Sequence, residues 1–330
     1  MKILLTGGAG YIGSHAALAL LDYKHEVTII DNLSTGNIKL IPPNANFIKC
    51  NINDIKIVSS LIQKEKFDAL MHFAGYIQVE ESVKNPKKYF ENNTENSKIL
   101  LDTCSKNNLL NIIFSSTAAA YGNPINPSSV KEESLLKPLN PYGESKIRTE
   151  LYLQKKMRLN HIILRYFNVA GADPEMWSGL ISKDPTHLIK IASEVAVGKR
   201  KRITIFGDDY PTPDGTAVRD YIHVSDLADI HVKAAEYLIK NKSSAILNCG
   251  YGKGFSVKDV LNVVNKVNKK KINFKKGARR AGDSSMLISN VSKLNNLLKW
   301  KPKYNDLKFI IKTSLDWEKK LLNEEFKEHA

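Results

Sequence analysis

Near its N-terminus the chain reads Thr6-Gly-Gly-Ala-Gly-Tyr-Ile-Gly13, with glycines at positions 7, 10 and 13. The run before it, Met1 to Thr6, is typical of a buried strand, and Tyr11 to Asp22 carries apolar residues at helical spacing. The first glycine permits a tight turn, the second lets the backbone approach a pyrophosphate, and the third lets helix and strand pack closely. The free N–H groups of such a helix favour phosphate. The pattern predicts a dinucleotide site, although a glycine triplet alone also suits an ordinary turn.

A carboxylate follows the second predicted strand and indicates which dinucleotide is bound. Asp31 ends the run Val27 to Ile30, where it can accept hydrogen bonds from the adenosine ribose hydroxyls. Asp31 would repel a 2′-phosphate, and Asn32-Leu-Ser-Thr-Gly36 offers no arginine to receive one. The sequence therefore predicts NAD rather than NADP. Asn51, after the third strand, is either an adenine contact or a turn residue.

Short apolar runs alternate with segments long enough for a helix through the first half of the chain. This alternation predicts an α/β fold with a parallel, doubly wound Rossmann-type sheet covered by helices on both faces. After Phe167 glycine, proline and aspartate interrupt the pattern. We expect an NAD-binding domain over 1–168 and a smaller α/β substrate-binding domain over 169–330, with part of about 216–250 returning to the main sheet. The further runs are Phe47 to Ile48, Ala69 to Phe73, Asn111 to Ser115 and His161 to Leu164.

The composition of the chain indicates which classes of binding partner to expect. Lys and Arg number 49 against 34 Asp and Glu, a formal net charge of +15, which suits anionic ligands. The basic clusters at Lys199 to Arg202 and Lys269 to Lys271 lie beside no nucleic-acid motif, so we expect no nucleic-acid partner. No stretch approaches about 20 apolar residues, which predicts no membrane partner. Cys50, Cys104 and Cys249 suit buried thiols in a reducing compartment, and we expect a cytoplasmic protein.

A tyrosine and a lysine form the predicted catalytic pair. Tyr142 and Lys146 are spaced i, i+4 in Pro141-Tyr-Gly-Glu-Ser-Lys146, so a helix places them on one face. Lowering the pKa of a tyrosine from about 10 to near 7 requires roughly 4 kcal/mol, which a nearby ammonium and a positive nicotinamide ring can supply. Such a tyrosine acts as general base and then as general acid. Without the rest of the site, the same spacing suits an amphipathic surface helix.

A run of three hydroxyl residues completes the predicted catalytic group. Ser115-Ser-Thr117 ends the fifth predicted strand, and the carboxyl ends of parallel strands face the ligand crevice. Thr117 is therefore expected to hydrogen-bond the reacting oxygen, unless these residues only form a turn.

The motifs together resemble the extended short-chain dehydrogenase/reductase superfamily and, within it, the UDP-glucose 4-epimerases, over nearly the whole chain. Besides the glycine turn, the resemblance rests on these stretches: Asp31-Asn-Leu33, His72-Phe-Ala-Gly75, Glu81-Ser82, Phe114-Ser-Ser-Thr117, Pro141-Tyr-Gly143, Leu164-Arg-Tyr-Phe-Asn168, Ile205-Phe-Gly-Asp-Asp-Tyr-Pro211, Asp214-Gly-Thr216, Val218-Arg-Asp-Tyr-Ile-His-Val224 and Arg279-Arg-Ala-Gly-Asp283.

The resemblance implies an isomerase that interconverts UDP-glucose and UDP-galactose. Hydride leaves C4 of the hexose for bound NAD, and it returns to the opposite face of the resulting 4-keto sugar. The implied cofactor residues are Gly7, Gly10, Tyr11, Ile12, Gly13, Asp31, Asn32, Asn51, Ile52, Phe73, Ala74, Gly75, Asn92, Ser115, Tyr142, Lys146 and Tyr166. The implied substrate residues are Phe167, Asn168, His187, Leu188, Thr204, Phe206, Arg219, Tyr221, Arg280, Asp283 and Leu287.

Four positions depart from the family pattern. Thr117 stands where a serine is frequent, Ile77 replaces a lysine near the nicotinamide phosphate, and His187 replaces an asparagine. Leu287, four residues after Asp283, is smaller than the tyrosine that would exclude a C2 N-acetyl group. Activity on UDP-N-acetylglucosamine as well as UDP-glucose is therefore an alternative expectation, unless Leu287 only packs the pocket wall.

Two other functions were weighed against the epimerase. A nucleotide-sugar dehydratase needs an acidic residue near Thr117, where the chain has Ala118, Ala119 and Ala120. An NAD-sensing protein has no need for both a tyrosine and a lysine. No spacing of His, Cys and carboxylates predicts a metal. The family implies a homodimer, for which the candidate helices are Val83 to Lys106 and Asn140 to Lys156.

Overall fold

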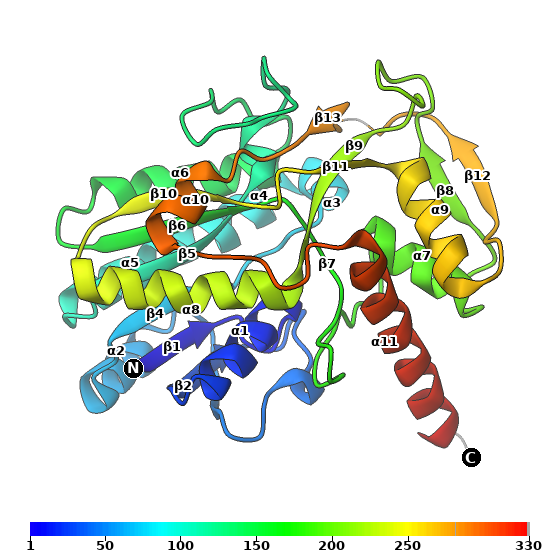
Figure 1. The fold of residues 1–330 in the computed structure, drawn as a ribbon. Coiled ribbons are helices and arrows are strands. Elements are labelled where there is room, and N and C mark those ends of the chain that lie inside the picture. Colours follow the sequence, from blue (N-terminus) through cyan, green and yellow to red (C-terminus); the bar gives the residue numbers. More distant parts are fainter. Residues whose placement is uncertain (281, 329–330) are drawn as a thin grey trace.

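A seven-stranded parallel sheet forms the centre of the molecule in a computed structural model, which describes residues 1–280 and 282–328 (Figure 1). Its strand order is β10-β6-β5-β4-β1-β2-β3, and every neighbouring pair is parallel. The predicted fold class is confirmed. The strands are β1 (Lys2–Thr6), β2 (Glu26–Asp31), β3 (Asn46–Lys49), β4 (Ala69–His72), β5 (Asn111–Thr117), β6 (Asn160–Tyr166) and β10 (Ala245–Cys249).

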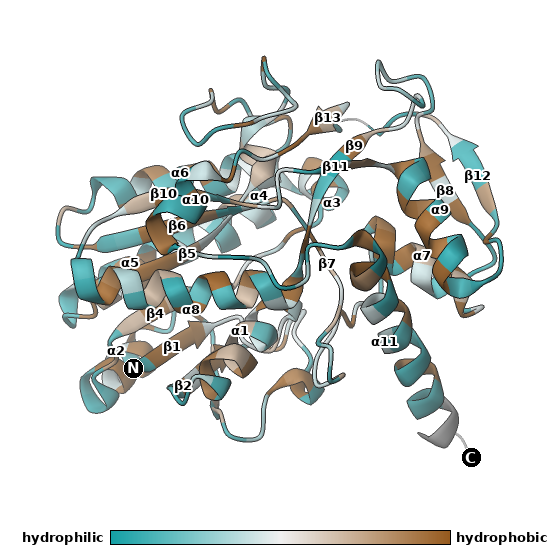
Figure 2. Cartoon of the chain, in the orientation of Figure 1, coloured by the Kyte–Doolittle hydropathy of each residue, from teal (hydrophilic) through white to brown (hydrophobic). Residues whose placement is uncertain are grey.

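Helices cover both faces of this sheet because alternate strand residues point to opposite sides. On β1, Ile3 and Leu5 belong to one core cluster, which also holds residues of α1 (Tyr11–Asp22), α8 (Val224–Asn241) and α10 (Ser292–Leu298). Leu4 belongs to the opposite cluster, with residues of α2 (Ile55–Glu65), α5 (Asn96–Lys106) and α6 (Pro141–Lys155). Figure 2 shows the apolar strands enclosed between helices with polar outer faces. In the described part of the chain, no helix has the length and apolarity that crossing a membrane requires.

The order of the strands reverses at β1, which lies between β2 and β4. Ligands of doubly wound sheets bind outside the carboxyl ends of the strands at such a switch point. The glycine turn follows β1, Asp31 ends β2, and Thr117 ends β5. The sheet therefore brings the predicted cofactor and catalytic residues to one edge.

The C-terminal half adds a second, smaller body of structure at one side of this edge (Figure 1). β9 pairs with β7, β11 and β13, and β8 pairs with β12. Helices α7, α9 and α11 enclose a further apolar core. β10 joins the main sheet beside β6; the division into two domains at residue 168 stays a prediction. The remaining bounds are β7 (Asn168–Ala170), α7 (Leu188–Ala196), β8 (Ile203–Phe206), β9 (Val218–His223), β11 (Gly254–Ser256), α9 (Val257–Asn268), β12 (Phe274–Gly277), β13 (Met286–Leu287) and α11 (Leu307–Glu328).

One helical segment differs from the prediction. The expected helix from Val83 to Lys106 is divided into α3 (Val79–Lys84), α4 (Pro86–Tyr89), the π-helix η2 (Phe90–Glu95) and α5. Proline disfavours helical geometry at the preceding residue, and Asn85 has φ −131° and ψ 63°. Two 3₁₀ turns complete the structure, η1 (Ile38–Leu40) and η3 (Ala118–Tyr121).

Candidate functional site

The glycine turn between β1 and α1 is built so closely that side chains do not fit. Gly7 has φ +73°, and a Cβ there would lie 2.5 Å from the backbone N of Ala74. A Cβ on Gly13 would lie 2.3 Å from the Gly7 carbonyl oxygen. Gly10 caps α1 and lines the cofactor groove described next. The first and third glycines thus permit backbone contacts, while the second exposes the helix end.

A groove runs from this turn along the ends of the strands, and its lining is more polar than apolar. We call it the cofactor groove. Asp31 lies in its wall and accepts hydrogen bonds from the backbone N–H groups of Ala9, at 3.0 Å, and Leu33, at 2.8 Å. Ten predicted cofactor residues line the groove: Gly7, Gly10, Asp31, Asn32, Asn51, Ile52, Phe73, Ala74, Gly75 and Asn92. A glycine at the start of α1 and a carboxylate at the end of β2, both lining one groove, fit an adenine dinucleotide.

Three predicted cofactor residues near the turn lie outside the cofactor groove. The Tyr11 hydroxyl donates to the Gly171 carbonyl at 2.6 Å, and its ring lines a second cavity. Ile12 packs against the core below the sheet, and Gly13 packs against the turn.

Sequence reasoning missed other residues that line the cofactor groove. The sequence analysis used the stretch Asn32-Leu-Ser-Thr-Gly36 only as an argument against NADP. In the structure, Gly36 lies against the Asp31 carboxylate. Its position directly after the ribose-binding carboxylate was the available signal. The missed residues are Ile30, Ser34, Thr35, Gly36, Cys50, Asn53, Tyr76 and Asn96.

Asn93 is a further buried residue that the sequence did not single out. Its side-chain oxygen accepts from the Tyr76 N–H at 2.8 Å, and its amide donates to the Tyr76 carbonyl at 2.9 Å and to Ser145 Oγ at 3.2 Å. It therefore joins the wall of the cofactor groove to α6. Its only signal was adjacency to Asn92, within a π-helix of the kind that is frequent at functional sites.

The predicted catalytic residues meet where α6 crosses the end of β5. Asn140 caps α6 by accepting a hydrogen bond from Gly143 N at 2.9 Å, which begins the helix next to Tyr142. The Tyr142 and Thr117 hydroxyls are hydrogen-bonded to each other. The buried Lys146 ammonium donates to the Ser115 carbonyl at 2.9 Å. The phenol, the hydroxyl and the ammonium thus lie together.

The electrostatics of this group concern the expected acidity of Tyr142. Burial raises the pKa of the Tyr142 phenol, and only the hydrogen bond from Thr117 lowers it. Burial also lowers the pKa of Lys146 to about 8, against a smaller opposing effect of the Glu150 carboxylate. The protein alone therefore does not make Tyr142 acidic, because desolvation penalises the charged forms of both groups. The expected phenolate therefore depends on the positive nicotinamide ring in addition to the Lys146 ammonium.

Tyr166, at the end of β6, lies behind this group. Its hydroxyl is hydrogen-bonded to the Ser115 side chain and, at 2.5 Å, to His231 Nε2. Its side chain belongs to the core cluster that also holds residues of α8, and its cofactor role stays a prediction.

Most of the predicted substrate residues lie in the smaller body, while Phe167 packs against Ala118 and Tyr121, which follow β5. Arg280 lies over the Phe206 ring, 3.9 Å from its centroid. Arg219 donates to the backbone carbonyls of Val218, at 2.9 Å, and Ser284, at 2.6 Å. Those bonds fix the direction of its guanidinium. Thr204 lies on β8 next to Phe206, and Asp283 follows Arg280 in the loop before β13.

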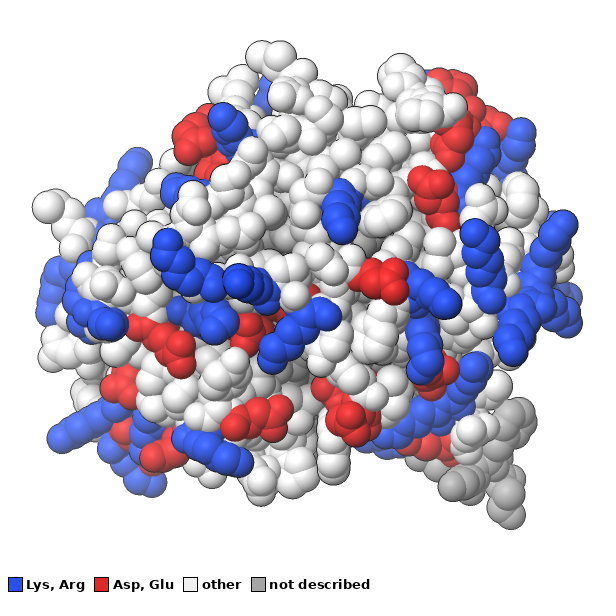
Figure 3. Space-filling view, viewed as in Figure 1, with Lys and Arg blue, Asp and Glu red and all other residues white. Residues whose placement is uncertain are grey.

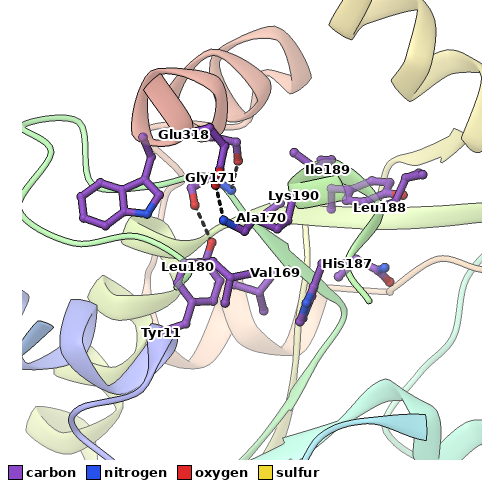
Figure 4. Close-up of a pocket in the computed structure, with 14 residues that line it drawn as sticks. Tyr11, Val169, Ala170, Gly171, Leu180, His187, Leu188, Ile189, Lys190 and Glu318 are labelled. Atoms are coloured by element: carbon purple, nitrogen blue, oxygen red, sulfur yellow. Dashed lines mark hydrogen bonds and ion pairs between the residues drawn. The ribbon is translucent and has the colours of Figure 1, made fainter. Parts of the chain in front are cut away.

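The second cavity lies between β7, α7 and α11 (Figure 4). Four predicted substrate residues line it, namely Asn168, His187, Leu188 and Tyr221. Asn168 and Tyr221 are register partners across β7 and β9. His187 precedes α7 and its buried Nδ1 has no hydrogen-bond partner. A ligand that reaches this cavity would meet the N-terminal end of α7.

Leu287 lies on the wall between the catalytic and substrate residues. Its side chain is buried in one cluster with Ala118, Tyr121, Val130 and Phe167. Ala118 directly follows the catalytic Thr117. The packing of Leu287 against this cluster is what the structure shows, and its effect on sugar size stays a prediction.

Figure 3 shows Lys and Arg spread over one face, with Asp and Glu between them. Among residues 1–280 and 282–328, no group of three or more His, Cys, Asp or Glu side chains is placed to hold a metal ion.

Comparisons with known proteins agree with this geometry. The family model described as "NAD dependent epimerase/dehydratase family" matches residues 3–250. The UDP-glucose 4-epimerase of Azospirillum brasilense is 42% identical over 323 residues, covering 97% of this chain and 92% of that protein. That of Lacticaseibacillus casei is 44% identical over 320 residues, 96% of each.

Solved structures match over the same length. A UDP-Glc/GlcNAc 4-epimerase from Campylobacter jejuni is 47% identical with a TM-score of 0.83, covering 97% of this chain and 99% of that one. A UDP-glucose-4-epimerase from Stenotrophomonas maltophila, with bound NAD and formylated UDP-arabinopyranose, is 33% identical with a TM-score of 0.94, covering 98% and 99%.

Proposed function

This chain belongs to the NAD dependent epimerase/dehydratase family, and from that membership we propose that it is an NAD-dependent UDP-glucose 4-epimerase. The observation that carries the proposal is the meeting of Tyr142, Lys146 and Thr117 at the carboxyl end of β5, beside the cofactor groove. The activity is the interconversion of UDP-glucose and UDP-galactose through a 4-keto sugar.

NAD, when bound, supplies the hydride acceptor and donor for C4. Tyr142 takes the proton of the C4 hydroxyl as hydride leaves, and it returns a proton to the ketone oxygen in the reverse step. Thr117 donates a hydrogen bond to the same oxygens. Lys146, held by the Ser115 carbonyl, contributes the positive charge that favours the phenolate.

The nucleotide end of the substrate holds the sugar in place. Arg219 and Arg280 present planar guanidinium groups, which match phosphate oxygens better than ammonium groups do. Asp283 binds the ribose. The 4-keto sugar must turn so that its other face receives hydride, and contacts to the hexose are therefore weaker than those to UDP.

The test is turnover by the purified protein without added metal. We expect UDP-galactose to be converted to UDP-glucose, and acid extraction of the protein to release adenine dinucleotide. Mass spectrometry of the product separates the rivals, because a dehydratase would release water from the sugar. Failure to convert either sugar, together with no dinucleotide bound or taken up, would overturn the proposal.

Acceptance of N-acetylated sugars is a second candidate function. Leu287 occupies the wall behind Phe167, where a tyrosine would fill more space, and the C. jejuni relative is named for both UDP-Glc and UDP-GlcNAc. A substrate panel of the glucose, galactose, N-acetylglucosamine and N-acetylgalactosamine forms tests it. No turnover of either acetylated sugar would remove this candidate.

Homodimerisation is part of the same proposal. Val83 on α3 and Leu151 on α6 are apolar yet 53% and 49% exposed, which suits helices that pack against a second copy. Light scattering after gel filtration is expected to give twice the chain mass. The exchange Leu151→Glu is expected to give monomers, and an unchanged mass would contradict this interface.

A cytoplasmic location also remains part of the proposal. Cys50, Cys104 and Cys249 are buried and free, as expected in a reducing compartment. Fractionation of the native cells would test this location.

A further inference from the structure

A charged pair lies buried behind the catalytic group, and the mechanism above does not use it. Glu150 on α6 is 0% exposed and Arg165 on β6 is 2% exposed. Arg165 belongs to the Leu164-to-Asn168 motif, and Glu150 stands two helical turns after Tyr142. Two fully buried charges in one place call for a reason beyond packing.

Hydrogen bonds satisfy both members of the pair. Arg165 Nη2 donates to Glu150 Oε2 at 2.6 Å, and Nε donates to both carboxylate oxygens at 3.1 and 3.2 Å. The Ser116 hydroxyl also donates to Glu150. Arg165 Nη1 donates to the Tyr121 hydroxyl and to the Glu132 carbonyl, each at 3.0 Å. Apolar residues of the same volume frequently stabilise a fold as well as such a pair does, so stability alone does not account for it.

The pair is joined to the catalytic residues through one strand and one helix. Tyr142, Lys146 and Glu150 are spaced i, i+4 and i+8, on one side of α6. Each of them binds a residue at the end of β5: Tyr142 binds Thr117, Lys146 binds the Ser115 carbonyl, and Glu150 binds Ser116. Consecutive residues of the catalytic strand are thus tied to successive turns of the catalytic helix. Arg165, on β6, binds Glu150 and so connects the last of these contacts to the neighbouring strand.

We propose that Glu150, held by Arg165, is a positioning residue for this reaction: it docks the catalytic helix on β5 and sets the charge that Lys146 and Tyr142 experience. The inference rests on the proposed function, in which the rate of epimerisation depends on Tyr142 and Lys146.

The sign of the effect follows from the groups around Lys146. The Glu150 carboxylate favours the Lys146 ammonium, and the other neighbours are the Tyr142 phenol, the Phe114 ring, the Ser115 carbonyl and His72. His72 is neutral at ordinary pH, because burial lowers its pKa to about 3. Replacing Glu150 by glutamine leaves the Arg165 cation without its counter-charge. An added positive charge lowers the pKa of both Lys146 and Tyr142.

The experiment is the pH profile of kcat/KM for the full chain with NAD. Glu150→Gln is expected to move both limbs of the profile to lower pH, by about two units for Lys146 at about 6 Å and by about one unit for Tyr142 at about 12 Å, with an effective dielectric constant of about 20. Glu150→Gln combined with Arg165→Met removes both charges. This double variant should move the limbs in the same direction by about half as much, because Glu150 is the nearer charge to Lys146.

A matched control lies on the same helix. Glu144 pairs with Arg148 at the surface, and its side chain is 44% exposed. Glu144→Gln makes the same charge change, but solvent screens it. The limbs of its profile should stay at their wild-type positions.

The outcomes separate a tuning role from a merely structural one. Limbs that stay at wild-type positions in Glu150→Gln and in the double variant, whatever the rate, would overturn the proposal. If Glu150→Gln does not fold, the double variant decides, because it buries no unpaired charge. If the unmodified protein turns over no UDP-hexose, the proposed function fails instead, and the two failures are thereby distinguished.

Discussion

Replacing Tyr142 by phenylalanine removes one oxygen from the centre of the site and keeps the ring. The ring lies edge-on to Tyr89 with centroids 6.4 Å apart, and this packing survives the exchange. What is lost in the fold is the hydrogen bond to Thr117, which contributes about 1 kcal/mol. A typical domain is stable by about 5–15 kcal/mol, so the variant should fold. Its Tm should fall by only about 2–4 °C.

The effect on the rate is expected to be far larger. Loss of a general acid and base lowers kcat by about 10²- to 10⁴-fold, which corresponds to roughly 3–5 kcal/mol in the barrier. The assay is conversion of UDP-galactose at saturating NAD, with bound dinucleotide measured on the same preparation. NAD binding should be within a few-fold of the wild type, because Tyr142 lies beyond the glycine turn and Asp31.

Tyr89→Phe is the matched control for this exchange. Its hydroxyl is also engaged, accepting from Gln78 N at 3.0 Å and donating to Glu81 at 2.9 Å, but it has no role in the reaction. This variant should keep at least about a third of wild-type kcat, since it loses only ordinary hydrogen bonds. The reasoning is refuted if Tyr142→Phe retains more than a tenth of wild-type turnover, or if both variants lose the same amount.

Four further outcomes follow from the site. The pKa of Lys146 is lowered to about 8, and its protonated form is the active one. The value of kcat/KM should therefore fall as pH rises through about 8. A kcat/KM that stays unchanged up to pH 10 would contradict this role. Gly7→Ala places a Cβ 2.5 Å from Ala74 N and should abolish NAD retention, measured as dinucleotide released by acid; normal retention would show that the turn adapts. Asp31→Ala removes two charge-assisted hydrogen bonds to ribose, of about 1.5–3 kcal/mol each, and should weaken NAD binding by at least about tenfold in calorimetry; an unchanged Kd would place the ribose elsewhere. If the unmodified chain turns over UDP-N-acetylglucosamine, Leu287→Tyr should reduce that turnover by more than tenfold and keep the turnover of UDP-glucose. Assays of the two sugars side by side measure this difference. Equal losses for both sugars would mean that Leu287 only packs the wall.

The features that sequence predicted well are those set by short-range geometry. The glycine turn was predictable because a φ of +73° at Gly7 and the contact at Gly13 depend on residues a few positions apart or on the adjoining strand. The parallel sheet followed from apolar runs separated by helical segments. The pairing of Tyr142 with Lys146 followed from the rise of a helix. The break at Asn85 was also a local signal, carried by Pro86, but the prediction did not use it.

Only the tertiary structure decided which groups from separate elements meet and how burial changes their charge. Glu150 and Arg165 are neighbours because α6 lies on β5 and β6. Their separation in the sequence does not predict this contact. Burial raises the pKa of Tyr142 in the protein alone, and the i, i+4 spacing to Lys146 does not reveal that burial. Periodicity encodes which face of an element is apolar, whereas desolvation and Coulomb energies depend on distances and solvent exclusion that arise only when those faces pack.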